Sequence, residues 1–221
     1  MDFAAFDALT FDCYGTLIDW ETGILAALTP IVPDDEALLE RFAAHEAELE
    51  AGPYLKYAEV LRQCAERLGA APEEARAFGR SVTDWPAFED SPEALQRLKT
   101  RFKLGVITNC DDDLFAASNE KLHVDFDWVI TAEQARGYKP RIENFEFAFA
   151  RIDVPRERIL HVAQSLFHDH VPAKALGLTT VWVDRRQGES GGATPPADAT
   201  PDLTVPDLKT LADRATGTTS A

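Results

Sequence analysis

The chain has 221 residues, 45% of them apolar, which suffices for one large hydrophobic core or for one core with a small appended domain. Its net charge of −16 argues against a nucleic-acid-binding protein, because phosphate binding depends on clustered Lys and Arg, and none are clustered here. No apolar stretch approaches the roughly 18 residues of a membrane span, and no basic region precedes the first apolar run. We therefore expect a cytoplasmic protein that binds neither nucleic acid nor membranes.

The first apolar run, residues 6–11, predicts a buried strand that ends in Asp12, and a turn follows at Gly15. In open parallel α/β sheets, ligands bind beyond the carboxyl ends of the strands. Asp12 therefore has a position typical of a catalytic carboxylate. An aspartate that merely begins a turn gives the same pattern, so this motif alone does not decide the function.

Three later apolar runs repeat this arrangement of a strand followed by polar or charged side chains. They are residues 103–107, followed by Thr108 and Asn109; residues 126–130, followed by a loop with Lys139; and residues 159–163, followed by Ser165, His168 and Asp169. Because the carboxyl ends of parallel strands lie along one edge of a sheet, we expect these side chains to converge with Asp12 on one cleft.

Between residues 20 and 88 the strand-like runs give way to helical patterns. The expected helices span residues 34–50, 54–68 and 72–83, with proline and acidic residues marking helix starts at 33–36 and 71–74. The strands resume after Ser91, which we expect to cap a helix. The alternation of strands and helices in the rest of the chain predicts an α/β fold: a doubly wound, Rossmann-like parallel sheet with an inserted helical cap.

The expected domains are a core, residues 1–17 and 89–221, and a cap, residues 18–88. After Asp169 the pattern predicts a helix at 171–176 that ends at Gly177, and then a strand at 179–183. Residues 187–201, rich in Gly, Ala, Pro and Thr, are typical of a loop with no catalytic part. A short strand and a helix at 203–215 close the core, and residues 216–221 are expected to fray.

These motifs, from about residue 6 to residue 186, resemble the haloacid dehalogenase superfamily of aspartate-nucleophile hydrolases. The order of a carboxylate, hydroxyl donors, a lysine and a second carboxylate carries the resemblance. It implies that Asp12 attacks as a carboxylate and forms a covalent ester, with Thr16 holding it in place. It further implies that Lys139 keeps Asp12 ionised and that Asp169 orients or deprotonates the hydrolytic water.

The residue two positions after Asp12 bears on the leaving group. Phosphatases of this superfamily carry a second aspartate there, which protonates the leaving alkoxide, whereas this chain has Tyr14. The motif from Asp12 to Thr16 resembles that of the L-2-haloacid dehalogenase branch, in which the carboxylate displaces halide from the carbon next to the substrate's acid group. The resemblance therefore implies a small carboxylic acid as substrate and Tyr14 as one of its contacts.

The same resemblance implies further substrate contacts. Thr108 and Asn109 match donors that hold the substrate carboxylate, and Ser165 and His168 lie in the last motif before Asp169. Two more candidates come from the first long cap helix. Arg41 matches an arginine that receives the leaving halide or the substrate acid, and His45, four residues on, shares its helix face.

Several positions depart from the dehalogenase pattern. Gln164 and Leu166 stand where we expect serine and asparagine, and Phe145 stands where we expect tyrosine. Residues 11–23 and 165–170 also resemble azetidine-2-carboxylate hydrolase of the same superfamily, which opens a four-membered ring and expels an amine. Under that alternative His168, Tyr14 or His45 is the group that keeps the leaving amine protonated.

Two further alternatives stay open. A phosphatase of this superfamily would hold Mg²⁺ with Asp12 and Asp169. A non-catalytic member would bind a small acid or act as a regulatory partner. Otherwise no cofactor and no metal are expected, and the three cysteines lack the spacing of metal ligands. Because the dehalogenase branch is often dimeric, the resemblance also implies a homodimer.

Overall fold

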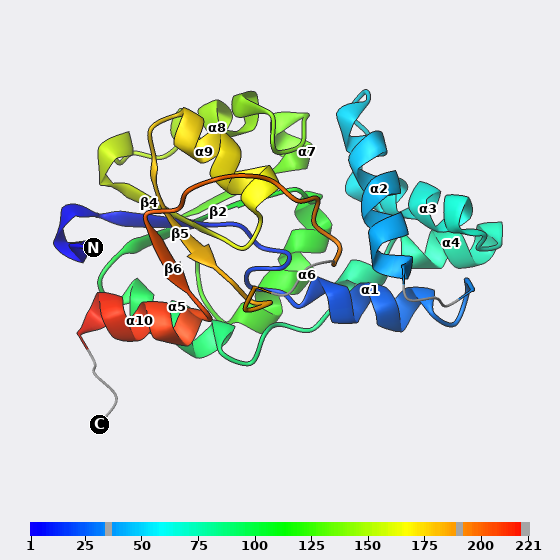
Figure 1. The fold of residues 1–221 in the computed structure, drawn as a ribbon, viewed down its shortest axis with the longest axis horizontal. Helices are drawn as coiled ribbons and strands as arrows, with labels where there is room; N and C mark the ends of the chain where they lie inside the picture. Colours follow the sequence, from blue (N-terminus) through cyan, green and yellow to red (C-terminus); the bar gives the residue numbers. More distant parts are fainter. Residues whose placement is uncertain (34–36, 189–191, 218–221) are drawn as a thin grey trace.

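The computed structural model describes residues 1–33, 37–188 and 192–217. Six parallel strands form one sheet in the order β3-β2-β1-β4-β5-β6 (Figure 1). They are β1 (Ala8–Phe11), β2 (Lys103–Thr108), β3 (Trp128–Thr131), β4 (Ile159–Ala163), β5 (Thr179–Val183) and β6 (Leu203–Val205). Helices cover both faces of this sheet. The predicted α/β fold with a doubly wound, Rossmann-like parallel sheet is therefore confirmed.

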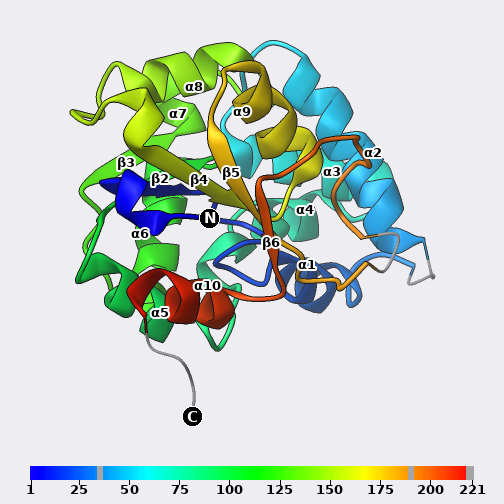
Figure 2. The ribbon, with the colours of Figure 1, turned by 60° about the vertical axis from the view of Figure 1, so that its left-hand side comes forward.

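The helices of the core lie in two layers, one on each face of the sheet (Figure 2). One layer contains α5 (Ser91–Lys99), α6 (Asp112–Leu122) and α10 (Leu208–Thr216), and the other contains α7 (Ala132–Ala135), α8 (Ile142–Phe149) and α9 (Val171–Ala175). Because side chains of a strand alternate between faces, Leu9 and Phe11 pack into the larger apolar cluster and Ala8 packs into the smaller one with Phe145.

The two central strands bring the ends of the first and last motifs together. β1 and β4 are buried along their whole length, and Phe11 pairs with Val162. The backbone N–H of Asp12 continues the pairing by donating to the carbonyl of Val162 at 3.0 Å. The chain adds strands to opposite sides of this pair, so the switch point of the sheet, where ligands bind in such folds, lies beside Asp12.

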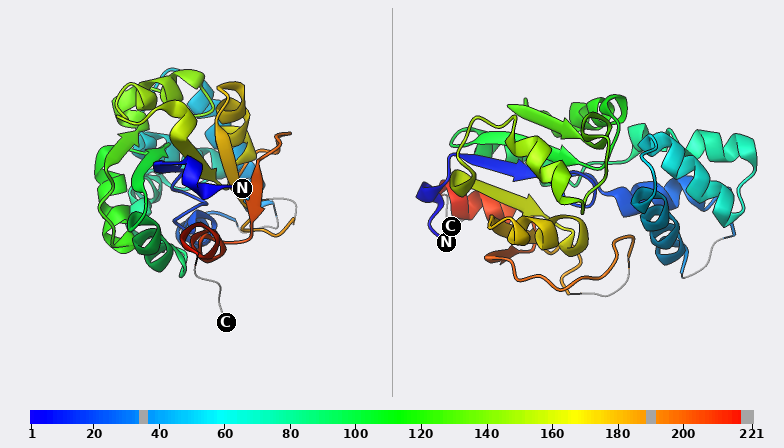
Figure 3. Two further views of the ribbon diagram at one scale, coloured as in Figure 1. Left: turned by 90° about the vertical axis from the view of Figure 1, so that its left-hand side faces the viewer. Right: turned by 90° about the horizontal axis from the view of Figure 1, so that it is seen from above.

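Four helices, called the helical segment below, lie beyond the carboxyl ends of the strands (Figures 1 and 3). They are α1 (Trp20–Leu28), α2 (Leu38–Ala51), α3 (Tyr57–Leu68) and α4 (Pro72–Phe78). The chain enters and leaves this segment at one place, because Asp19 N donates to Pro86 O at 2.8 Å and Phe88 N donates to Leu17 O at 3.0 Å. These contacts lie at the predicted boundaries, residues 17/18 and 88/89. That this helical segment is a separate cap domain stays a prediction.

The helix bounds differ from the expected ones at the start of α3, which is Tyr57 and not residue 54, and at the end of α4. The predicted helix at 72–83 ends at Phe78, and a separate 3₁₀ turn follows at Ser81–Asp84. Gly79 stands between them in close contact with α3, where a Cβ would lie 2.5 Å from the carbonyl oxygen of Ala58. The predicted start at 33–36 falls partly on residues 34–36, which lie outside the described residues.

Ser91 does not cap α5, which corrects the prediction. Its Oγ donates to the carbonyl of Leu17 at 2.9 Å, and the residue before the helix, Asp90, makes no side-chain capping bond. Because Ser91 is fully buried, its hydroxyl needs a partner within the protein, and the nearby start of the helical segment provides one.

The remaining elements agree with the expected order. Short 3₁₀ helices occur at Phe3–Ala5 and Arg156–Arg158, and β6 and α10 form the predicted closing strand and helix. Of the residues expected to fray, 218–221 lie outside the described part of the chain. Within the described ranges no helix is both long enough and apolar enough for a membrane crossing.

Candidate active site

Both carboxylate oxygens of Asp12 are held by side chains from the predicted motifs. Oδ2 accepts a hydrogen bond from Oγ1 of Thr16 at 2.7 Å, and Oδ1 accepts one from Nζ of Lys139 at 2.9 Å. The turn that brings Thr16 back to Asp12 passes through Gly15, whose φ of +88° suits glycine. The hydroxyl of Thr16 in turn accepts from the backbone N–H of Gln164 at 2.9 Å. The nucleophile predicted from the sequence therefore has a fixed orientation.

Lys139 joins the two motif carboxylates. Its side chain is 1% exposed, and Nζ donates to Asp12, to Oδ1 of Asp169 at 2.8 Å and to the carbonyl of Ile107 at 2.8 Å. These three acceptors match the three protons of an ammonium. Burial alone would lower the pKa of Lys139, but the two carboxylates raise it above its usual range. The ammonium is therefore charged and fully engaged.

Asp169 is buried and has a second partner that was not predicted. Its Oδ1 lies 2.9 Å from Nε2 of His161, whose Nδ1 lies 3.0 Å from Oγ1 of Thr10. Burial alone would raise the pKa of Asp169, but Lys139 and His161 lower it below its usual range. Within the described part of the chain its Oδ2 has no hydrogen-bond partner. A buried acceptor of this kind is suited to bind a water or an N–H group of a ligand.

The pKa values of Asp12 and Asp169 are shifted in opposite directions. Burial raises the pKa of Asp12 above its usual value; Lys139 opposes this rise, and the charge of Asp169 adds to it. A carboxylate with a raised pKa holds its electron pairs less tightly and is the more reactive nucleophile of the two. The environments thus make Asp12 the more basic carboxylate and Asp169 the more acidic one.

The hydroxyl of Tyr14 does not replace the missing acid of the phosphatases. It lies 3.0 Å from Oγ of Ser118 and accepts a bond from Sγ of Cys110 at 3.2 Å, so it is occupied within the core. Burial raises the pKa of Tyr14 well above its usual value. The tyrosine therefore contributes a pocket wall, whereas a proton donor for a leaving group is not found at this position.

Asp12 lines a pocket of about 30 Å³, which is small. Its lining includes the predicted residues Asp12, Tyr14, Asn109, Lys139, Ser165, His168 and Asp169. It also includes residues that were not predicted, namely Trp20, Glu46, Glu50, Tyr57 and Thr194. Thr194 belongs to the stretch 187–201, which was expected to have no part in the site and of which 189–191 lie outside the described residues.

Arg41 and His45, the two predicted contacts from α2, are not among the residues that line this pocket. The buried side of α2 carries Leu38, Phe42, Ala43, Glu46, Leu49 and Glu50, while Arg41 and His45 are only partly buried. Successive residues of a helix point about 100° apart, so the neighbouring residues His45 and Glu46 face different directions, and Glu46 is the one that lines the pocket. The apolar spacing of Leu38, Phe42 and Leu49 is the signal that identifies this face.

Of the two predicted residues after β2, Asn109 lines the pocket and Thr108 does not. Thr108 is buried outside the pocket lining, and its Oγ1 has no hydrogen-bond partner in the described ranges. The side-chain amide of Asn109 makes two hydrogen bonds with the backbone of Lys139. Its Oδ1 accepts from Lys139 N at 2.7 Å, and its Nδ2 donates to Lys139 O at 3.0 Å. The same Nδ2 donates to Oε2 of Glu50 at 3.3 Å. Asn109 therefore holds Lys139 in place and reaches the helical segment.

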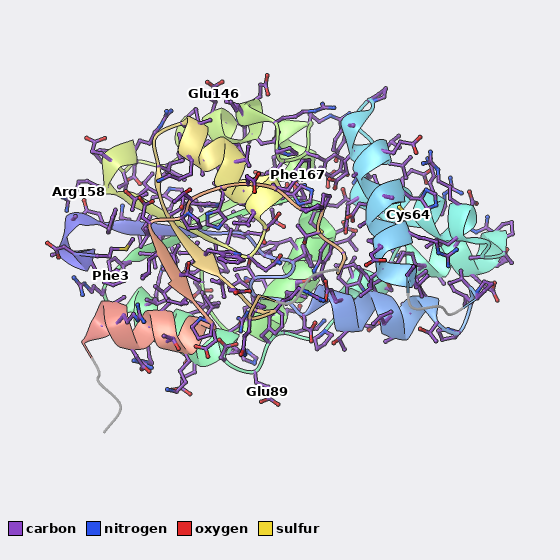
Figure 4. All side chains as sticks on the ribbon, in the orientation of Figure 1. Phe3, Cys64, Glu89, Glu146, Arg158 and Phe167 are labelled. Carbon is purple, nitrogen blue, oxygen red and sulfur yellow. The ribbon has the colours of Figure 1, made fainter. Side chains whose placement is uncertain are left out.

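Ser165 and His168 shape the turn after β4. The backbone N–H of His168 donates to Oγ of Ser165 at 2.9 Å, which begins a π-helical turn, Leu166–His170, that includes Phe167, labelled in Figure 4. Burial lowers the pKa of His168 to about 4. The imidazole is therefore neutral near pH 7 and binds a proton only weakly, so it is poorly suited to keep a leaving amine protonated.

Two core residues of opposite charge hold the helix ends beside the pocket. The carboxylate of Asp111 accepts from the N–H groups of Tyr57 at 2.9 Å and Ala58 at 3.1 Å, at the start of α3. Nη2 of Arg141 donates to the carbonyls of Ala51 at 2.9 Å and Gly52 at 2.8 Å, at the end of α2. Both charges match the helix dipole. The contact with Asp111 also explains why α3 begins at Tyr57, later than the sequence pattern predicts.

The carboxylates present do not fit a shared magnesium ion well. Two carboxylates with several waters are a usual Mg²⁺ site. Here Oδ1 of Asp12 and Oδ1 of Asp169 both bind Lys139, and Oδ2 of Asp12 binds Thr16, which leaves Oδ2 of Asp169. No group of three or more His, Cys, Asp or Glu side chains that could hold a metal occurs in the part of the chain that the structure describes.

Comparison with known proteins agrees with this geometry. Residues 6–177 match the model of the haloacid dehalogenase-like hydrolase family. The chain is 25% identical over 221 residues to (S)-2-haloacid dehalogenase H-109 of Pseudomonas putida, covering 94% of this chain and 96% of that protein. It is 30% identical over 188 residues to a phosphoserine phosphatase of Thermus thermophilus, covering 79% and 71%.

Among solved structures, L-2-haloacid dehalogenase from Xanthobacter autotrophicus with chloropropionic acid covalently bound has the same fold. The TM-score is 0.79 at 20% identity, covering 97% of this chain and all of that one, 100%. Because the family model spans most of the chain, it establishes the family independently of this likeness in fold. The chain belongs to the haloacid dehalogenase-like hydrolases.

Proposed function

We propose that this protein hydrolyses a small carboxylic acid at carbon, with Asp12 displacing a leaving group from C2 or a nearby carbon and forming a covalent ester. The observation that supports this most is the pair of bonds from Thr16 and Lys139 that hold Asp12, together with Tyr14 in place of a proton-donating carboxylic acid. The similar fold of a dehalogenase with chloropropionic acid covalently bound adds support for a covalent intermediate.

In the first step a carboxylate oxygen of Asp12 attacks the substrate carbon. Each oxygen accepts one hydrogen bond here and retains a further lone pair for the attack. The oxygen–carbon bond forms while the leaving group departs with the electron pair of the broken bond. Lys139 and Thr16 restrict the orientation of Asp12, which lowers the entropic part of the barrier.

In the second step water attacks the carboxyl carbon of the Asp12 ester. The bond from this carbon to the substrate oxygen then breaks, one proton of the water passes to that oxygen to give the hydroxyl product, and the other is released as Asp12 returns to its carboxylate. Oδ2 of Asp169, a buried acceptor that lines the pocket, is placed to orient that water. The lowered pKa values of Asp169 and His168 make both groups weak bases, so the role of Asp169 is to orient the water. Lys139 and Thr16 stabilise the negative charge that develops on the Asp12 oxygens.

The leaving group separates the candidate reactions. A halide needs no proton, which agrees with the occupied hydroxyl of Tyr14. Ring opening with release of an amine is the second candidate, and the acidic residues of α2 favour it, as argued below. A Mg²⁺-dependent phosphatase is the third. Neither Tyr14 nor the carboxylates bridged by Lys139 favour it.

A single panel of assays tests this proposal. The protein is incubated with L-2-chloropropionate, fluoroacetate, azetidine-2-carboxylate and phosphate esters, with and without EDTA. We expect turnover of a 2-substituted acid that EDTA leaves unchanged. Asp12→Asn should reduce it by more than about 1000-fold, and Asp125→Asn, an exposed control, should not. The mass of the Asp12→Asn protein is checked before and after assay, because deamidation would restore the aspartate.

The opposite result is equally definite. Release of phosphate by the unmodified protein that depends on Mg²⁺, without activity on any of the 2-substituted acids, would replace the proposal by the phosphatase alternative. Full activity in a folded Asp12→Asn protein of unchanged mass would remove Asp12 from the mechanism.

A further inference from the structure

Two carboxyl groups of the helical segment line the same pocket as the nucleophile. Glu46 and Glu50 lie one turn apart on α2 and are 4% and 7% exposed. Oε1 of Glu46 accepts from the hydroxyl of Tyr57 at 2.8 Å, and Oε2 of Glu50 accepts from Nδ2 of Asn109 at 3.3 Å. Among the ion pairs of the described residues, neither glutamate has a lysine or arginine partner, and the His168 imidazole, 3.9 Å from Glu50, is neutral near pH 7. These two glutamates are called the acidic wall below.

The pocket contains more acidic groups than basic ones. Its lining contains four carboxyl groups, Asp12, Glu46, Glu50 and Asp169, and one ammonium, Lys139. That ammonium is already shared between Asp12 and Asp169. Burial raises the pKa of Glu46 to about 7 and the pKa of Glu50 well above its usual value, so both carboxyl groups favour the protonated form while no cation lies beside them. A cationic group at this wall would lower both pKa values and let the two glutamates ionise. Buried carboxylates are strongly stabilised by such a partner.

Two further features of the pocket suit an ammonium group. Tyr14, Trp20 and Tyr57 line it, and the rings of Tyr14 and Tyr57 lie 6.4 Å apart. Aromatic faces attract cations, and carboxylates beside them add to this attraction. Independently, Oδ2 of the fully buried Asp169 is an acceptor without a donor in the described part of the chain. It is available to an N–H group as well as to water.

The amide of Asn109 points to the same conclusion. The resemblance to haloacid dehalogenases implies that this residue binds a substrate carboxylate, but its Nδ2 contacts the carboxyl group of Glu50 instead. A substrate carboxylate at Nδ2 would therefore lie against Glu50. Arg141 and Asp111 fix the ends of α2 and α3, so the acidic wall is held in this position by the core.

We propose that Glu50, with Glu46 beside it, binds the positively charged amino group of the substrate, so that the small carboxylic acid is an amino acid. That the bound amino acid is also the substrate rests on the proposed function, in which Asp12 reacts at carbon. Binding of an unreactive ligand depends on the acidic wall alone. The two can therefore be tested separately.

The experiment uses two ligand pairs that differ in the amino group and contain no leaving group. L-Proline is compared with cyclopentanecarboxylate, and L-alanine with propionate, by titration calorimetry of the unmodified protein at pH 8. We expect each amino acid to bind at least about tenfold more tightly than its partner, because only the amino acid carries an ammonium. Glu50→Gln should remove this preference, and Glu46→Gln should reduce it.

Glu40→Gln is the matched control, because Glu40 lies on the same helix but is exposed. It should leave both affinities unchanged, and circular dichroism should show that all variants are folded. The proposal is overturned if neither amino acid binds more tightly than its partner, if no amino acid binds at all, or if the preference survives in folded Glu50→Gln.

The outcomes also separate this inference from the proposed function. An Asp12 ester formed from 2-chloropropionate, with no preference for the amino acids, would retain the proposed function and overturn the acidic wall as an ammonium site. A preference for amino acids that Glu50→Gln removes, without an Asp12 ester from any substrate of the panel, would support the site and overturn the proposed function.

Discussion

Asn109 and Glu50 meet between the core and the helical segment, where Nδ2 of Asn109 donates to Oε2 of Glu50 at 3.3 Å. The same nitrogen donates to the backbone carbonyl of Lys139 at 3.0 Å. One amide thus contacts both the loop that carries the catalytic lysine and the helix that carries the acidic wall. Asn109 therefore links the position of the loop with Lys139 to the position of α2.

The end of α2 depends on Arg141, whose guanidinium binds the carbonyls of Ala51 and Gly52. Arg141→Ala leaves these acceptors without their donor and should lower the free energy of unfolding by roughly 1–3 kcal/mol. Arg80→Ala serves as control, because its ion pair with Asp113 is exposed and spans 3.7 Å, and it should cost less than about 0.5 kcal/mol. Urea denaturation measures both. Equal losses would show that Arg141 does not hold the helix end.

Tyr14 should act through its ring and not through its hydroxyl, which is bonded to Ser118 and Cys110. Tyr14→Phe should therefore keep kcat within about threefold, whereas loss of a catalytic proton donor would cost roughly 100-fold or more. The free energy of unfolding should fall by about 1 kcal/mol, because the hydroxyl of Ser118 loses a partner. Steady-state assays and denaturation test this. A large fall in kcat with an intact fold would place the phenol in the reaction.

Glu46 should make stability depend on pH. Burial raises the pKa of Glu46 from 4.5 to about 7, so the native protein retains a proton that the unfolded chain releases above pH 4.5. The stability from this group is complete below pH 4.5 and is lost as the pH rises toward 7. Glu46→Gln cannot ionise but still offers an oxygen to Tyr57. It should therefore be more stable than the unmodified protein at pH 8, by roughly 1–3 kcal/mol, and similar to it at pH 5.

Denaturation of both proteins at the two pH values checks this sign. Glu40→Gln, on the exposed side of the same helix, should change little at either pH. A Glu46→Gln protein that is less stable at pH 8 than the unmodified one would show that the native state favours the charged carboxylate.

The charged centre of the site could be predicted from the sequence because it follows from strand order. Asp12, Lys139 and Asp169 each come after a strand of one parallel sheet, and such ends converge at the switch point. The buried strands are short apolar runs, which are easily recognised. Thr16 could be placed for a similar reason, since a glycine turn brings it back to the carboxylate only four residues away.

The residues that form the walls of the pocket could not all be predicted, because they are brought together by contacts between segments far apart in the chain. Which residues of α2 face the nucleophile depends on how this helix packs, and a rotation by one residue separates His45 from Glu46. The spacing of Leu38, Phe42 and Leu49 contained this information, whereas resemblance to the family favoured Arg41 and His45, whose roles stay predictions. Thr194 reaches the site from a stretch without secondary structure, so no periodic pattern indicates it.

The central claim is that Asp12 forms an ester that water then cleaves at the carboxyl carbon. The measurement is a single turnover in H₂¹⁸O with the protein in excess over substrate, followed by mass analysis of the peptide that contains Asp12 and of the product. The account predicts that the first labelled oxygen appears in Asp12, as a gain of about 2 Da in that peptide, while the product contains none. Label that appears directly in the product, with an unlabelled Asp12, would show that water attacks the substrate itself and would contradict the account.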